Sequence, residues 1–280
     1  MTYKTILVHC DASRSVAHRL DVAAGLAQRF DAHLVGLHVR PPFEAPMYIE
    51  GSYPMDDLYK AYEENVKADQ TAASAAFVKA IKGMALSSEW RVVEGFSESV
   101  LAVHARYADL VVVGQTDPET TANTPTPSDL PETVALSTGR AVLVVPHIGV
   151  RKAPGDVVML CWNASRESAR AATEALPLLK AASQVVVLVV DAKASAAGHG
   201  AEPGADAAAW LSRHGIKVTV QRDSAPDADI GSMILSRAAE HGADLIVMGI
   251  YGHSRMREWA LGGASRTLLS SMNLPVLMAH

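Results

Sequence analysis

Short apolar runs alternate along the chain with stretches whose apolar residues recur at a helical period. The stretch after the first run shows this period at Val16, Leu20, Ala23 and Ala27. A short run that is apolar throughout is typical of a strand buried on both faces, as in a parallel sheet covered by helices. We therefore predict an α/β fold with right-handed crossovers. The predicted strands are 5–10, 31–39, 108–114, 141–146, 156–162, 184–190, 244–249 and 275–280, and the predicted helices include 56–82 and 169–179.

The second half of the chain repeats the first. Asp11, which follows the first strand, corresponds to Asn163, an offset of 163 − 11 = 152 residues. The strand that begins at Asp109 corresponds to the strand that begins at Asp244, an offset of 244 − 109 = 135 residues. The sequence therefore predicts two tandem domains. Their expected ranges are 1–149 and 155–280, joined by a short turn-forming linker at 149–155.

A glycine-punctuated basic loop follows the strand 244–249. It carries Gly249, Gly252 and the pair Gly262-Gly263, after which Leu268 and Leu269 mark the inward face of a helix. The first N–H groups of a helix are unpaired and its dipole is positive there, so this end attracts anions. Glycines let a phosphate approach the backbone closely, and His253, Arg255 and Arg257 add side-chain donors. The segment therefore predicts a phosphate-binding loop.

Each glycine alone has a simpler interpretation. Gly249 and Gly252 are also what a turn requires, and Gly262-Gly263 also suits a close helix contact. The loop lacks the Gly-Lys-Ser/Thr of a Walker P-loop, and no Gly-x-Gly-x-x-Gly follows an early strand. Only the combination of strand, spaced glycines, basic residues and helix start favours a ligand.

This spacing resembles the universal stress protein family. Gly249, two residues, Gly252, nine residues and Gly262 reproduce its Gly-x2-Gly-x9-Gly-Ser/Thr loop, except that Gly263 stands at the Ser/Thr position and Ser265 follows. The resemblance covers nearly the whole chain. It implies two tandem Rossmann-like domains of the adenine nucleotide alpha hydrolase type, each with a five-stranded, mostly parallel sheet and helices on both faces.

The two halves differ at the positions that the family uses for nucleotide. By the 135-residue offset, Gly252 corresponds to Asp117 and Gly262 to Pro127, so a carboxylate and a proline replace the cradle in the first half. Ser128, which corresponds to Gly263, is expected to cap the following helix. The family's Asp after the first strand is kept as Asp11 in the first half but replaced by Asn163 in the second.

The resemblance implies that the second half binds ATP, or another adenine nucleotide, with Mg²⁺ as companion, and acts as a cytoplasmic stress sensor or regulator. Slow ATP hydrolysis or autophosphorylation is one alternative, and a scaffold without nucleotide is another. No catalytic or metal-ligating residue is predicted, because Asp244 and Glu258 are also explained as capping or surface groups. The residues expected at the nucleotide are Asn163, Val190, Met248, Gly249, Gly252, His253, Arg255, Gly262, Gly263 and Ser265.

Family members often dimerise through their last strands. The resemblance therefore implies that the two halves form an internal pseudo-dimer in which 142–145 meets 276–278, and the sequence leaves open a homodimer of two chains.

Composition excludes several classes of protein. The net charge of −5 and the lack of a Lys/Arg run argue against nucleic-acid binding. No apolar run approaches the roughly 18 residues that a membrane span needs, and the N-terminal residues lack signal-peptide features, which favours the cytoplasm. The two cysteines, Cys10 and Cys161, are too few for a disulfide scaffold and are expected to be small buried residues. His9 is expected to be a satisfied core residue.

Overall fold

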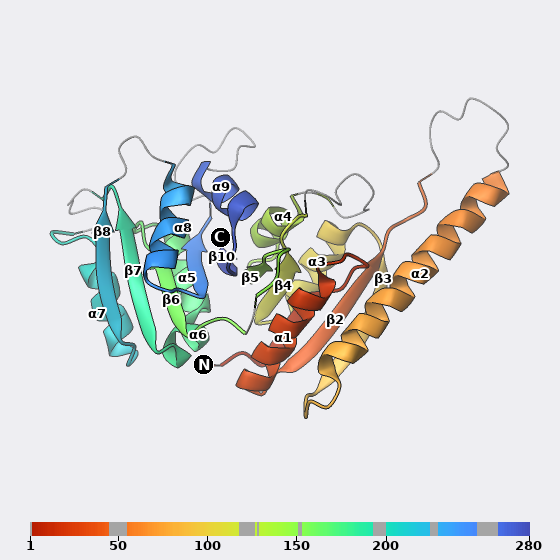
Figure 1. Cartoon of the computed structure of the whole chain (residues 1–280), viewed down its shortest axis with the longest axis horizontal. Coiled ribbons are helices and arrows are strands. Elements are labelled where there is room, and N and C mark those ends of the chain that lie inside the picture. Colours follow the sequence, from red (N-terminus) through yellow and green to blue (C-terminus); the bar gives the residue numbers. More distant parts are fainter. Residues whose placement is uncertain are drawn as a thin grey trace.

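The structure is a computed structural model that describes residues 2–44, 55–117, 127, 129–150, 153–192, 200–224, 229–250 and 263–280. Strands and helices alternate through both halves (Figure 1). The N-terminal half contains β1 (Thr5–His9), α1 (Val16–Phe30), β2 (His33–Arg40), α2 (Met55–Ile81), β3 (Ser88–Glu94), α3 (Ser97–Ala105), β4 (Leu110–Gly114), α4 (Leu130–Ser137) and β5 (Ala141–Val145). The C-terminal half contains β6 (Val157–Cys161), α5 (Arg166–Glu174), α6 (Leu176–Ala181), β7 (Gln184–Val190), α7 (Ala205–Arg213), β8 (Val218–Asp223), α8 (Ile230–Glu240), β9 (Leu245–Gly249), α9 (Gly263–Ser271) and β10 (Val276–Ala279).

All ten strands join one sheet in the order β3-β2-β1-β4-β5-β10-β9-β6-β7-β8. Within each half the strands are parallel, and five strands come from each half. The predicted α/β fold with two mostly parallel five-stranded units is therefore confirmed.

The two halves meet at an antiparallel seam between β5 and β10. Val276 pairs with Val144, Leu277 with Leu143 and Met278 with Val142, which confirms the predicted pseudo-dimer contact. Because the two strands run in opposite directions, the carboxyl end of β5 lies beside the amino end of β10.

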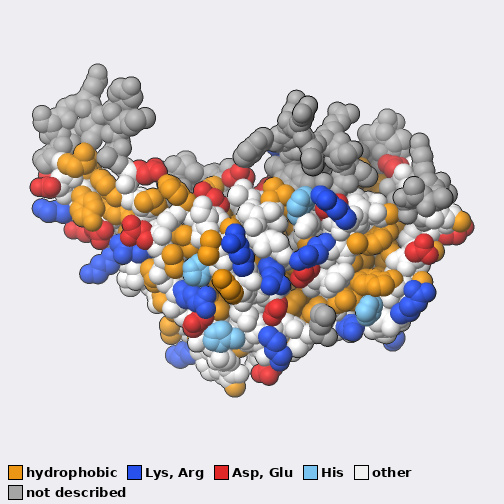
Figure 2. Space-filling view, turned by 180° about the vertical axis from the view of Figure 1, so that it is seen from behind, with side chains coloured by type: hydrophobic (Ala, Val, Ile, Leu, Met, Phe, Trp, Pro, Cys, Tyr) orange, Lys and Arg blue, Asp and Glu red, His pale blue; other side chains and the backbone are white. Residues whose placement is uncertain are grey.

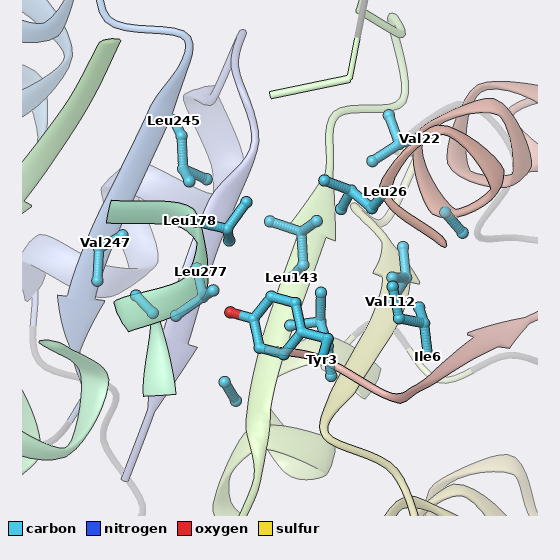
Figure 3. Packing of buried hydrophobic residues seen from close by; sticks show 14 of the residues in the cluster. Tyr3, Ile6, Val22, Leu26, Val112, Leu143, Leu178, Leu245, Val247 and Leu277 are labelled. Atoms are coloured by element: carbon cyan, nitrogen blue, oxygen red, sulfur yellow. The ribbon is translucent and has the colours of Figure 1, made fainter. Parts of the chain in front are cut away.

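Helices cover both faces of the sheet and create two apolar layers. One layer packs under α1, α2, α5, α6 and α7, and the other under α3, α4, α8 and α9. Successive side chains of a strand point to opposite faces of the sheet, so each strand contributes to both layers. In β1, Ile6 and Val8 lie in the first layer and Leu7 lies in the second. The first layer is continuous across the seam, where Leu143 and Leu277 pack near Leu178 (Figure 3).

Polar contacts also cross between the halves. The Tyr3 hydroxyl, which points toward the C-terminal half in Figure 3, donates to the carbonyl of Glu174 at 2.8 Å. The Arg29 guanidinium of α1 donates to the carbonyls of Pro154, Gly155 and Ala181 at 3.1, 3.3 and 3.0 Å. The first half is thus tied to the linker and to α6 as well as to β10.

Three local predictions were incomplete or wrong. The helix predicted over 169–179 is two helices, α5 and α6, separated at Ala175 where Pro177 opens the second. The residue at the N-cap of α4 is Asp129, not Ser128, which lies outside the described residues. The edge strands β3 and β8 were not marked by apolar runs because their side chains are largely half-exposed.

The long helix α2 lies along the outer edge of the sheet and extends past the ends of the strands (Figure 1). On the face shown in Figure 2, Lys and Arg side chains are interspersed with Asp, Glu and hydrophobic ones. Among the helices that the structure describes, none is long and apolar enough to cross a membrane.

Candidate functional site

Each half has a switch point where chain connections leave two neighbouring strands in opposite directions. In the C-terminal half it lies between β6 and β9, and in the N-terminal half between β1 and β4. At such a point the carboxyl ends of the strands border a crevice, which is where ligands bind in open α/β sheets. Asn163 and Gly249 stand at this edge of the C-terminal half, and Asp11 and Gly114 at that of the N-terminal half.

Asn163 begins a tight turn between β6 and α5. Its Oδ1 accepts a hydrogen bond from the backbone N–H of Ser165 at 3.2 Å, while Ala164 between them has φ +57°. The Ser165 hydroxyl then caps α5 by accepting from the N–H of Ser168 at 3.1 Å. The Asn163 side chain is exposed at this edge, held by the backbone turn. The structure therefore places Asn163 at the carboxyl end of β6, and its contact with a nucleotide stays a prediction.

Val190 and Met248 lie at the ends of the flanking strands. Val190 is the last residue of β7, which pairs with β6, and is half-buried. The Met248 side chain is buried in the second apolar layer, which leaves its backbone, not its side chain, for a ligand.

Gly249 has a packing role that the loop motif did not reveal. It ends β9, and a Cβ added there would overlap the carbonyl carbon of Glu167 and the backbone N of Ser168, in the first turn of α5. Its φ is not in the left-handed region. Gly249 is therefore explained by close helix packing, whatever it also contributes to a ligand.

Glu167 lies in the first turn of α5, next to Gly249. The sequence analysis did not identify this buried carboxylate. It is 4% exposed and its side chain contacts the Nε of Arg166. Burial alone would raise its pKa, but the hydrogen bond from Arg166 and those from its own N–H and Ser165 outweigh burial and lower the pKa. The sequence feature that could have identified Glu167 is its place in the first turn of α5, two residues after Ser165, which caps the helix.

The glycine loop itself falls on residues that the structure does not describe. Gly252, His253, Arg255 and Gly262 of the prediction lie outside the described residues, as does Glu258. The described part of α9 begins at Gly263, the first residue after the part of the loop that is not described, and Leu268 and Leu269 are buried as predicted. Ser265 is also buried, in the first turn of this helix.

In the N-terminal half, an ion pair between Arg19 and Asp11 lies at the switch point between β1 and β4. The Arg19 guanidinium of α1 donates through Nη2 to Asp11 Oδ1 at 2.5 Å and to Ser13 Oγ at 3.0 Å. A Cβ added at Gly114 would lie 3.0 Å from Arg19 Nη1, so the guanidinium lies over the end of β4. By the 152-residue offset, the counterpart of Arg19 is Ala171.

This ion pair sets the charge states around it. Burial would raise the pKa of Asp11, but Arg19, His9 and the hydrogen bonds from Ser13 hold it well below its usual range. Burial, with Arg19 and His38 adding to it, lowers the pKa of His9 to about 4. The prediction that His9 is buried is confirmed, but its Nδ1 has no hydrogen-bond partner in the described part of the chain, so it is not satisfied.

Asp244 and Asp109 work at the opposite, amino edge of the strands. Asp244 Oδ1 accepts from the N–H groups of Gly155, Asp156 and Val157 at 2.9 to 3.2 Å, which ties the linker to β6. Asp109 Oδ2 accepts in the same way from the two N–H groups at 4 and 5. The capping interpretation of Asp244 is confirmed.

The described residues offer no preformed metal cage, since no group of three or more His, Cys, Asp or Glu side chains among them is placed to hold a metal ion. Burial raises the pKa of both Cys10 and Cys161 to about 12. Cys10 is buried as predicted, whereas Cys161 is half-buried, so the prediction is wrong for Cys161.

Comparison with known proteins agrees with this architecture. The model of the universal stress protein family matches residues 2–145 and 156–280. A universal stress protein from Archaeoglobus fulgidus has 17% identity and a TM-score of 0.68, covering 98% of this chain and 95% of that chain. A protein of unknown function from Pseudomonas aeruginosa has 14% identity and a TM-score of 0.57, covering 99% and 92%. No curated protein matches the chain. The structural similarities show the fold.

Proposed function

The chain belongs to the universal stress protein family, and we propose that its C-terminal half binds ATP, or another adenine nucleotide, so that the protein acts as a sensor or regulator in a stress response. In this proposal the domains are 1–149 and 155–280, and the second carries the ligand.

One observation carries the proposal: the residues at the C-terminal switch point form a turn and two element ends suited to a nucleotide. The Asn163 turn follows β6, Gly249 ends the neighbouring β9, and the helix that follows β9 is described from Gly263 on. In a parallel strand-helix-strand unit the helix begins at the carboxyl edge, so the N–H groups of α9 start on the ligand side.

The proposed contacts divide along this edge. Asn163 and the backbone near Val190 take the adenosine, because an amide both donates to and accepts from a base or ribose. Gly249, Gly263 and the segment between them, with Ser265, take the phosphates. Mg²⁺ prefers phosphate oxygens and water over an all-protein cage, so the lack of a preformed cluster among the described residues fits a metal carried by the nucleotide.

The N-terminal half is proposed not to bind nucleotide. Its switch point holds the Arg19 side chain over Gly114, where the C-terminal half has the small Ala171. Asp117 and Pro127 also replace two glycines of the loop. The expected stoichiometry is therefore one nucleotide per chain.

A fast phosphotransferase or hydrolase is not proposed. Phosphoryl transfer needs a carboxylate near the metal, and the Asp244 carboxylate is engaged with the linker N–H groups at the amino edge. Glu167 lies near Gly249 but is paired with Arg166. Slow turnover stays an alternative that phosphate release measures directly.

Thermal unfolding with and without Mg-ATP tests the proposal on the wild type and on Gly252→Asp, which copies Asp117 of the first half. Ligand at about a hundred times its Kd stabilises the folded state by roughly 2.7 kcal/mol. That corresponds to a rise in Tm of about 5 to 11 °C. The wild type is expected to show the rise and the variant to lose it. No rise in the wild type at millimolar Mg-ATP would refute nucleotide binding and favour a scaffold that keeps only the fold.

A further inference from the structure

The side chain of Gln115 joins the two halves at a place that the nucleotide motif does not include. Gln115 follows β4 directly and is 7% exposed. Its backbone N–H continues the sheet by donating to the carbonyl of Val145, at the end of β5. Because β5 and β10 are antiparallel, this end of β5 lies where the chain leaves α9 to enter β10.

Gln115 binds the C-terminal end of α9. Its Nε2 donates to the carbonyl of Leu269 at 2.8 Å and to that of Ser270 at 3.3 Å. Both carbonyls belong to the last turn of α9, where helix carbonyls have no partner within the helix. The N-terminal half therefore provides a side-chain cap for a helix of the C-terminal half.

The amide of Gln115 is held in one orientation. Its Oε1 accepts from the backbone N–H of His147 at 3.1 Å and contacts the ring Nδ1 of His147 at 2.9 Å. Since Nε2 faces two carbonyls, Oε1 must face His147, and the ring therefore carries its proton on Nδ1. One orientation of the Gln115 amide therefore satisfies all four contacts.

This contact is asymmetric between the halves. By the 135-residue offset, Gln115 corresponds to Ile250, whose apolar side chain is buried in the second layer and has no donor. The N-terminal half thus holds α9 through a side chain that the C-terminal half does not offer in return.

We propose that Gln115 is a positioning residue through which the N-terminal half fixes α9 and thereby sets the nucleotide affinity of the C-terminal half; this rests on the proposed function. The nine residues of α9 that the structure describes span about 13 Å, because a helix rises about 1.5 Å per residue. Its middle is held by Thr267, whose hydroxyl donates to Asp229 at 3.0 Å. The last turn and the middle of the described part of α9 are therefore each held by a side-chain contact.

The test replaces Gln115 with leucine, which keeps the size and removes the amide. Amide hydrogen exchange of 263–271 without nucleotide measures how firmly α9 is held, and calorimetric titration measures the Kd for Mg-ATP. In Gln115→Leu we expect the α9 amides to exchange faster and the Kd to rise about tenfold, the order of typical coupling between sites. His147→Asn, which retains a side-chain N–H, is expected to stay nearer the wild type than His147→Ala.

The matched control is Arg170→Ala. Arg170 Nη2 donates to the carbonyl of Gly139 at 2.6 Å and pairs with Glu174 in its own helix at 2.8 Å, so this variant loses an inter-half hydrogen bond and a local ion pair without touching α9. It should leave α9 exchange and the Kd unchanged. Equal α9 exchange in Gln115→Leu and the control would overturn the positioning role. Faster exchange with an unchanged Kd would overturn its link to affinity. If the wild type binds no Mg-ATP, the proposed function fails, while the exchange data still decide whether Gln115 holds α9.

Discussion

Replacing Gly249 with alanine tests whether this glycine serves packing as well as ligand binding. The first turn of α5 lies directly on Gly249, and the new methyl group would overlap the backbone of Glu167 and Ser168 and lie 2.8 Å from the Glu167 Cβ. Backbone atoms cannot rotate away, so α5 would have to move from the end of β9.

The expected cost follows from this overlap. Extra methyl groups in tightly packed cores destabilise by about 1 to 3 kcal/mol, and the upper end applies when the neighbour is backbone. The φ of Gly249 is outside the left-handed region, so alanine adds no backbone strain and recovers about 0.4 to 1 kcal/mol from the less flexible unfolded chain. The net loss is about 2 kcal/mol, or a fall in Tm of roughly 4 to 8 °C.

Gly114→Ala is the matched control in the other half. Its new Cβ would meet the end of the Arg19 side chain at 3.0 Å, and a long side chain yields more easily than backbone. We expect a loss of about 1 kcal/mol or less, because Arg19 can shift within its hydrogen bonds to Asp11.

Urea unfolding of both variants without nucleotide is the assay, since it separates packing from ligand binding. Gly249→Ala should unfold at a lower urea concentration than Gly114→Ala. If Gly249→Ala is as stable as the wild type and only its Mg-ATP affinity falls, the packing argument is wrong and Gly249 serves the ligand alone.

Two further variants probe the N-terminal half and its attachment. As pH falls from about 6.5 to about 4, His9 becomes protonated in the unfolded chain but not in the folded chain, because burial lowers its pKa there to about 4. The free energy of unfolding of the wild type should therefore fall by up to about 3 kcal/mol over this window. Urea unfolding at each pH should show that His9→Leu removes most of this pH dependence. Arg29→Ala, which loses three inter-half hydrogen bonds, should be destabilised by about 1 to 2 kcal/mol in the same assay with an unchanged Kd for Mg-ATP. A wild type whose stability is flat across the window, or an Arg29 variant as stable as the wild type, would contradict these arguments.

The architecture was readable from the sequence because it depends on repeated local patterns. Continuous apolar runs identified eight of the ten strands, and the family resemblance placed 142–145 against 276–278, which the register confirms. The runs missed β3 and β8, since an edge strand has a solvated side and a mixed pattern.

The contacts around the candidate site were less predictable. Arg19 over Gly114 and Gln115 at α9 each depend on a side chain that reaches a distant segment, and the contact of Gly249 with Glu167 depends on how α5 packs on β9; no spacing rule encodes these contacts. The repeat and the glycine motif did place Asn163 and Gly249 after neighbouring strands, at the carboxyl edge of the sheet. The glycines of the motif could not reveal that one of them is also required by helix packing.

The β5–β10 seam also changes what substitution can do to this protein. In a symmetric dimer of identical chains, every substitution at such a seam appears on both sides, so the new residue must be compatible with its own copy in the other chain. Here the two sides are different stretches of one chain, so Gln115 can face α9 while Ile250 stays apolar. The covalent link also makes the pairing independent of protein concentration, because neither half can be diluted away from the other. The side chains on the two sides of the seam can therefore differ without either half losing its partner.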